Sequence, residues 1–134
     1  MAAKVLDSFA LVAYFRGEAD GVPVKELLHK AAQADKPLHM TEVNYAEVKY
    51  IIIRKDGAAA WEAATKVLET LPIEFHPATR ALADAAADFK SRISFSLADA
   101  FAAALAKEKK AELVTGDPEF KAVEKEIKVN WLEK

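Results

Sequence analysis

Hydrophobic residues recur along this chain in short runs that alternate with longer segments of helical periodicity. The short runs predict strands at residues 4–7, 37–40, 73–75, 112–115 and 128–132. The longer segments predict helices at residues 8–16, 23–35, 41–55, 58–71, 78–92, 96–109 and 118–126. Capping residues such as Ser8 and Thr41, and breakers such as Gly17 and Pro72, mark several boundaries. Short apolar strands alternating with helices indicate an α/β fold with a mostly parallel sheet; the order of its strands stays open.

Composition narrows the class of protein. The 134 residues fit one domain, 1–134, and with 52% hydrophobic residues the chain can bury a core. A net charge of -2 gives no sign of nucleic-acid binding, so such binding would need a local patch or a metal ion. The absence of cysteine excludes disulfides, thiolate metal sites and a cysteine nucleophile. We expect a cytoplasmic location, because we see no secretory signal and no apolar run of about 18 residues.

Asp99 is a charged residue in an apolar helix. The segment 93–106 reads ISFSLADAFAAALA, and Asp99 is its only charged residue. A helix this apolar is expected to be buried on most sides, where a carboxylate needs a partner, a cavity or a metal ion. The alternative is a carboxylate near the helix start that accepts bonds from free backbone N–H groups.

Glu47 is a second acid beside apolar positions. On its helix the positions that share its face are Val43, Tyr50 and Ile51, whereas Glu42 points elsewhere. Glu47 is therefore expected on or beside the core stripe. The alternative is a glutamate at the edge of the stripe that reaches into solvent.

Two further acids follow predicted strands. Asp7 ends the first strand, and Asp117 follows the strand at 112–115 and precedes Pro118. In open α/β sheets, functional sites form at this edge. The alternative for each residue is an ordinary helix cap, and the cap followed by proline fits Asp117 especially well.

Taken together, the four acids predict a metal site. Carboxylates that share one pocket would repel one another, and a hard divalent cation such as Mg²⁺ relieves this repulsion. His29, His39 and His76 are scattered without H-x-x-x-H spacing, so we expect no competing histidine site.

The motifs around these acids resemble the PIN-domain family, in particular VapC-type toxins of toxin–antitoxin pairs. The matching segments are KVLDSFALVAYF, MTEVNYAEVKYIIIR and FSLADAFAAALAKEKKAELVTGDPEF. The resemblance assigns the family's acids to Asp7, Glu47, Asp99 and Asp117. Thr115 and Phe120 fall on the polar and apolar positions that flank the last acid, and Glu119 is either an additional outer acid or a solvated residue.

The resemblance implies a three-layer α/β sandwich and a metal-dependent endoribonuclease. One or two Mg²⁺ or Mn²⁺ ions would be held by Asp7, Asp99 and Asp117, with Glu47 as a ligand or as the holder of metal-bound water. It also implies an RNA substrate, a small antitoxin partner and a homodimer. No membrane association is expected.

Some surface roles follow as hypotheses. Lys49, Arg54 and Arg92 are candidate contacts to RNA phosphates; the alternative is that they belong to solvated faces. The apolar segments Leu11–Phe15 and Tyr50–Ile53 are candidate protein contacts, and core packing explains them equally well.

Four other functions are alternatives to this one. A non-toxin RNA-processing nuclease and a catalytically silent RNA-binding scaffold would share the same fold, although a complete acid set argues against the scaffold. A haloacid-type phosphatase with Asp7 as nucleophile needs an aspartate where Phe9 stands. A DNA-directed nuclease usually carries extra gripping segments, for which 134 residues leave little space.

Overall fold

The predicted alternation of strands and helices is confirmed by the structure. This computed structural model describes residues 2–132. Its strands are β1 (Lys4–Leu6), β2 (Leu38–Thr41), β3 (Ile73–His76), β4 (Glu112–Thr115) and β5 (Val129–Trp131). Its helices are α1 (Ser8–Phe15), α2 (Gly21–Ala34), α3 (Glu42–Asp56), α4 (Ala58–Leu68), α5 (Arg80–Arg92), α6 (Leu97–Lys109) and the 3₁₀ helix η1 (Pro118–Val123). None of these helices is long and apolar enough to cross a membrane.

The strands form one sheet in the order β3-β2-β1-β4-β5, and all of its pairings are parallel. The predicted mostly parallel sheet is thus parallel throughout. In a parallel sheet, the carboxyl ends of the strands meet at one edge. Because β1 and β4 are neighbours, the residues that follow them, Asp7 and Asp117, leave the sheet side by side.

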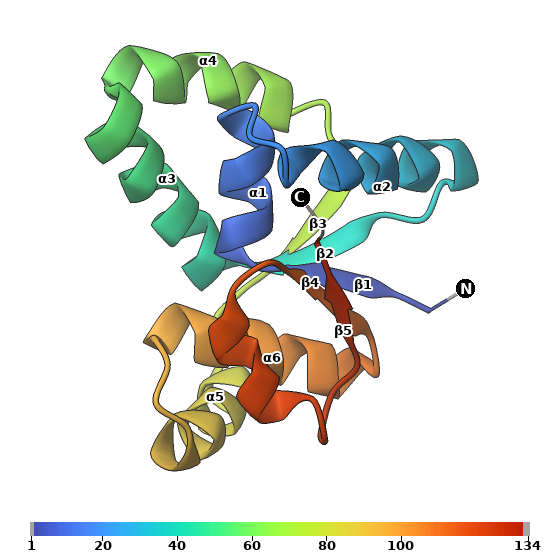
Figure 1. Ribbon diagram of the computed structural model, residues 1–134, viewed down its shortest axis with the longest axis vertical. Helices are drawn as coiled ribbons and strands as arrows, with labels where there is room; N and C mark the ends of the chain where they lie inside the picture. The colour runs from blue at the N-terminus through green and yellow to red at the C-terminus, as the bar shows by residue number, and fades with distance from the viewer. Residues whose placement is uncertain (1, 133–134) are drawn as a thin grey trace.

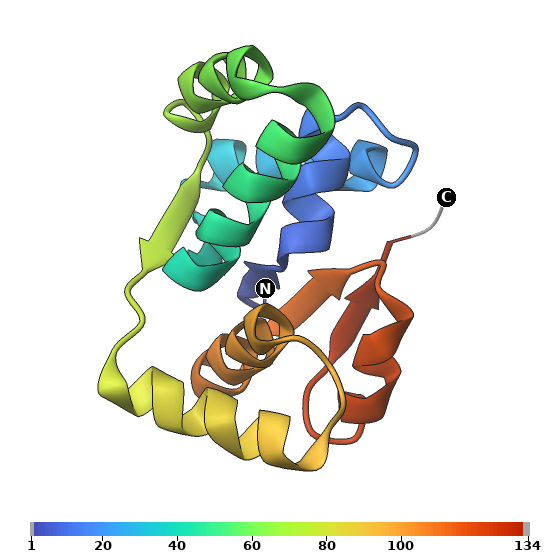
Figure 2. The same ribbon diagram turned by 90° about the vertical axis from the view of Figure 1, so that its left-hand side faces the viewer.

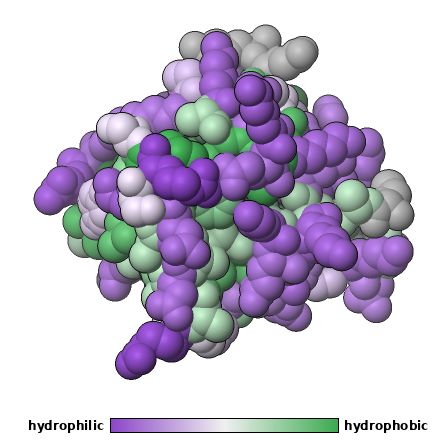
Figure 3. All heavy atoms as spheres, turned by 90° about the horizontal axis from the view of Figure 1, so that it is seen from below, coloured by the Kyte–Doolittle hydropathy of each residue, from purple (hydrophilic) through white to green (hydrophobic). Residues whose placement is uncertain are grey.

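Helices cover both faces of the sheet, which gives three layers. Helices α1 to α4 lie on one side, and α5, α6 and η1 lie on the other (Figure 1). Alternate residues of the central strands supply two cores: Val5 and Leu113 pack toward α5 and α6, whereas Leu6 and Val114 pack toward α1 and α3. Seen from below, toward α5 and α6, hydrophilic side chains project around smaller hydrophobic areas (Figure 3).

Several boundaries differ from the predicted ones for local reasons. Helix α5 begins at Arg80 because the Thr79 side chain accepts a hydrogen bond from the Leu82 N–H at 3.2 Å. Helix α2 begins at Gly21, two residues before Pro23. A side chain at position 21 would come within 2.4 Å of the Ala13 carbonyl oxygen, so glycine permits α1 and α2 to approach closely.

Candidate metal centre

Asp7 lies at the end of β1 and is only 1% exposed. Its Oδ1 accepts a hydrogen bond from the Ala10 N–H at 2.9 Å and so caps α1, and its Oδ2 accepts one from the Thr115 hydroxyl at 2.5 Å. Burial raises the pKa of Asp7 to about 8 against the effect of these two bonds, and the charges of Asp99 and Asp117 raise it further. The charged form of this carboxylate therefore calls for a compensating cation.

Asp117 is joined to Asp7 through Thr115. The Asp117 N–H donates to the Thr115 hydroxyl oxygen at 3.0 Å, and that hydroxyl donates to Asp7. The Asp117 side chain also caps η1 by accepting a bond from the Glu119 N–H at 2.9 Å. The helix-cap alternatives for Asp7 and Asp117 are thus both confirmed, and the caps lie at the same edge of the sheet.

Asp99 lies at the start of α6 in a capping box. Its side chain accepts from the Ser96 N–H at 3.3 Å, while its own N–H donates to the Ser96 hydroxyl at 3.0 Å. Asp99 is 7% exposed, and burial raises its pKa to about 6, with further contributions from the charges of Asp117 and Glu47. Asp99 therefore takes part in capping α6 and also lies close to other acids, so the two interpretations do not exclude each other.

The structure also brings Glu119 into this group. Asp99, Asp117 and Glu119 each offer a carboxylate oxygen, and these oxygens all lie within 4.8 Å of one another. Asp99 is buried, Asp117 is half-buried and Glu119 is exposed, so Glu119 stands at the outer side of the group. Three acids from α6 and η1 thus form a possible metal site beside Asp7.

Glu47 approaches the group from α3. The buried stripe of α3 consists of Asn44, Val48 and Ile52, and Glu47 is half-buried beside it. The Tyr50 hydroxyl donates to Glu47 Oε2 at 3.4 Å, and the charge of Glu47 reaches Asp99. Glu42, by contrast, is exposed. Glu47 thus lies beside the core stripe as expected, but Tyr50, which was expected to share that stripe, is 46% exposed.

Asn44, which no sequence motif indicated, is fully buried on α3. Its Nδ2 donates to the Ser8 hydroxyl at 3.0 Å and to the Ala98 carbonyl at 3.1 Å, and its Oδ1 accepts from Thr41 at 2.5 Å. These bonds tie together the starts of α1, α3 and α6. Asp7 directly precedes α1, and Glu47 and Asp99 lie within α3 and α6. The available signal was a polar residue at i-4 from Val48 on an apolar stripe.

Comparison with known proteins shows the family of this chain. The family model of the PIN domain matches residues 4–126. The chain belongs to the PIN domain family. No curated protein matches it in sequence.

Solved structures share the PIN fold of this chain at low sequence identity. DNA-bound VapBC from Salmonella typhimurium matches with a TM-score of 0.78 and 12% identity, covering 99% of this chain and 100% of that chain. VapBC2 from Rickettsia felis, bound to a promoter DNA fragment, matches with a TM-score of 0.71 and 16% identity, covering 96% of this chain and 98% of that chain. VapC20 of Mycobacterium tuberculosis, described as a toxin that cleaves the sarcin–ricin loop, matches with a TM-score of 0.66 and 19% identity, covering 90% of this chain and 95% of that chain.

The basic residues singled out in this PIN domain lie in different places. Lys49 and Arg54 are exposed on α3, the helix of Glu47, and the Arg54 guanidinium lies 5.1 Å from the centre of the Tyr50 ring. Arg92 instead binds Glu126 through two hydrogen bonds of 3.0 and 3.1 Å. Glu126 also lies 3.6 Å from Lys107 at the far end of α6 from Asp99, so the structure does not bring Arg92 to the acids.

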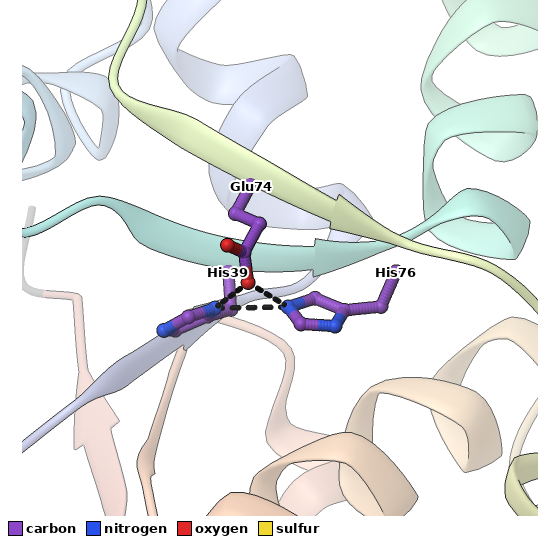
Figure 4. Close-up of side chains that lie close together, drawn as sticks. All are labelled: His39, Glu74 and His76. Atoms are coloured by element: carbon purple, nitrogen blue, oxygen red, sulfur yellow. Dashed lines mark hydrogen bonds and ion pairs between the residues drawn. The ribbon is translucent and has the colours of Figure 1, made fainter.

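The prediction that the histidines of this PIN domain are scattered is wrong for two of them. His39 on β2 and His76 on β3 have ring nitrogens 2.9 Å apart, and Glu74 contacts both rings (Figure 4). The pairing of β2 with β3 brings them together, and a sequence separation of 37 residues hides that pairing. His29 is exposed on α2 and belongs to neither group.

The donor chemistry of the acidic group fits a hard divalent cation. Its ligand atoms are carboxylate oxygens, which Mg²⁺ and Mn²⁺ prefer. Burial opposes the charges of Asp7 and Asp99 in the protein alone, and a cation would remove that opposition.

Proposed function

We propose that this PIN domain is a metal-dependent endoribonuclease. The observation that carries the proposal is the convergence of Asp7, Asp99 and Asp117, with Glu47 beside them, at the carboxyl edge of β1 and β4. Two of these acids are almost fully buried, and no basic side chain pairs with either of them among residues 2–132. Buried, unpaired carboxylates have a high energetic cost, which a bound cation would offset.

In this proposal, Asp7, Asp99 and Asp117 hold one or two Mg²⁺ or Mn²⁺ ions, and Glu47 is a further ligand or orients metal-bound water. Such an ion supplies a water of lowered pKa and neutralises negative charge at the phosphate. Thr115 fixes the carboxylate of Asp7, and Ser96 fixes that of Asp99. Asn44 keeps the three helix starts in register, so the acids are held in place before any ligand binds.

Single-stranded RNA is the proposed substrate. Lys49 and Arg54 are exposed on the helix that carries Glu47, and in this proposal they contact RNA phosphates. One structurally similar protein is described as a toxin that cleaves the sarcin–ricin loop, which is an RNA activity. That likeness supports RNA over DNA as the class of nucleic acid.

We further propose that the chain is the toxin of a VapBC-type pair, with a small antitoxin and a second copy of itself as partners. Similar structures are VapBC complexes, which supports the antitoxin. Tyr50 and Ile53 on α3 are 46% and 37% exposed, which suits a protein contact. In the segment Leu11–Phe15, by contrast, Leu11, Val12 and Ala13 are buried in the core.

An RNA cleavage assay tests the proposed function. The purified chain is incubated with labelled single-stranded RNA in Mg²⁺, in Mn²⁺ and in EDTA, next to the variant Asp117→Asn. We expect cleavage by the wild type in either metal, none in EDTA, and a loss of at least a hundredfold in the variant. Equal cleavage of RNA in EDTA would refute the mechanism, and cleavage of DNA alone would refute the substrate.

A further inference from the structure

Strands β2 and β3 carry three metal-ligating side chains on one face of the sheet. His39 stands directly opposite Glu74 in the parallel pairing, and His76 follows two residues after Glu74. Side chains two residues apart on a strand point to the same face. Ile73 and Phe75, the alternate residues of β3, pack with the opposite core. The register therefore directs all three side chains to the same point at the edge of the sheet.

The three donor atoms form a small triangle. His39 Nδ1 and His76 Nε2 are 2.9 Å apart, and Glu74 Oε2 lies 3.5 Å from the first and 3.0 Å from the second. Figure 4 shows both rings and the carboxylate directed toward one another from the two strands. Tetrahedral Zn²⁺ with ligands at roughly 2.1 Å separates them by about 3.4 Å. Small side-chain movements would thus open this triangle to the size of a zinc site.

We propose that His39, Glu74 and His76 form a second metal site, which binds Zn²⁺ through two imidazole nitrogens and one carboxylate oxygen, with water as the fourth ligand. This donor set differs from that of the acidic group. Imidazole nitrogen ligands favour Zn²⁺ and other first-row transition metals over Mg²⁺, whereas the acidic group offers only oxygen ligands. The two sites therefore take different metals.

The surroundings keep His39 ready to bind. Burial lowers the pKa of the His39 imidazole, and the charge of Lys109 and the neighbouring His76 lower it further, while Glu74 acts in the opposite direction. A neutral imidazole offers the free electron pair that a metal needs. Side-chain exposures of 14% for His39 and 20% for His76, against 54% for Glu74, leave the outer side of the triangle open to an entering ion.

An ion at this site would join the edge strand to its neighbour. β3 is the last strand of the sheet on its side, and from it the chain crosses to α5 (Figure 2). His76 is paired with Thr41, which caps α3 and bonds Asn44. Zn²⁺ would therefore stabilise the strand pair that leads into the helix of Glu47.

The test measures Zn²⁺ binding by calorimetry and the absorption of Co²⁺ as a zinc substitute, in buffer that contains Mg²⁺. The variants are His76→Ala and Glu74→Gln, and the matched control is His29→Ala, which removes an exposed histidine on α2. We expect one ion for the wild type and the control, the visible bands of tetrahedral Co²⁺, and a loss of affinity of at least tenfold in both site variants.

Two outcomes would overturn the proposal. The first is a wild type that binds Zn²⁺ no more tightly than Glu74→Gln, a substitution at an exposed side chain that should leave the fold intact. The second is loss of Zn²⁺ binding in the double variant Asp99→Asn with Asp117→Asn, which would place the ion in the acidic group. His76→Gln replaces His76→Ala if the latter does not fold.

Discussion

Replacing Asp7 by asparagine should change how the stability of the metal-free protein depends on pH. In the wild type, burial raises the pKa of Asp7 from 3.8 to about 8, so the folded state holds this proton more tightly than the unfolded state. The stabilisation from the neutral carboxyl is complete below the unfolded pKa and is lost as the pH rises toward the folded one. The stability of the metal-free wild type should therefore fall between about pH 4 and pH 8.

The size of this effect follows from the shift. Each pKa unit corresponds to about 1.4 kcal/mol, so Asp7 alone would lower the free energy of unfolding by up to about 4 kcal/mol between pH 5 and pH 8. The whole free energy of unfolding of such a domain is only about 5–15 kcal/mol, so a loss of about 4 kcal/mol would be a large part of it. Water entry and local movement around Asp7 should reduce the loss, and we expect a measured change of about 1–4 kcal/mol. Asparagine does not titrate and keeps an oxygen that accepts from the Ala10 N–H.

The assay is urea unfolding of wild type and Asp7→Asn in EDTA at pH 5 and pH 8. The difference in stability between variant and wild type should rise with pH in favour of the variant. Any constant cost of the altered bond to Thr115 cancels in this comparison of two pH values. A difference that is independent of pH would refute the conclusion that Asp7 is held neutral by its surroundings.

Three further predictions concern the other acids and the cell. Asp99→Asn keeps a side-chain oxygen for the Ser96 N–H and removes a charge, so without metal it should melt at or above the wild-type temperature. Added Mn²⁺ should raise the melting temperature of this variant less than that of the wild type. Differential scanning fluorimetry measures both effects. Glu47→Gln should lose most RNA cleavage, whereas the matched variant Glu42→Gln, altered at an exposed position of the same helix, should keep it; the reverse pattern would contradict the assignment. Expression of the wild type should arrest the growth of a bacterial host and Asp7→Asn at equal protein level should not; normal growth with abundant soluble wild type would favour RNA processing over a toxin.

Much of the fold was predictable because its signals are local. Caps such as Thr41, and breakers such as Pro72, act within one turn of the chain, so sequence alone places the element boundaries within a few residues. The prediction of Ser8 as a cap is wrong by one residue, because Asp7 caps α1 and Ser8 is its first residue. The acids were recognisable for a related reason, since a charge such as Asp99 in an apolar helix has few structural explanations.

The features that the sequence did not reveal depend on contacts between distant segments. Strand order and the pairing of β2 with β3 leave no local trace, so the meeting of His39 and His76 was missed. Asn44 is uncharged and therefore did not stand out among the apolar residues of α3, although it forms hydrogen bonds with residues at the starts of three helices. The place of Glu119 beside Asp99 likewise depends on how η1 packs against α6.

The most direct test of the central claim measures metal binding and RNA cleavage on the same samples. Mn²⁺ binding and the cleavage rate are followed across a titration of the metal-free wild type and of the double variant Asp99→Asn with Asp117→Asn. The account predicts that binding and cleavage rise together in the wild type and that the variant, still folded, loses both. Cleavage by the variant at the wild-type rate, or by the wild type before any Mn²⁺ is bound, would contradict it.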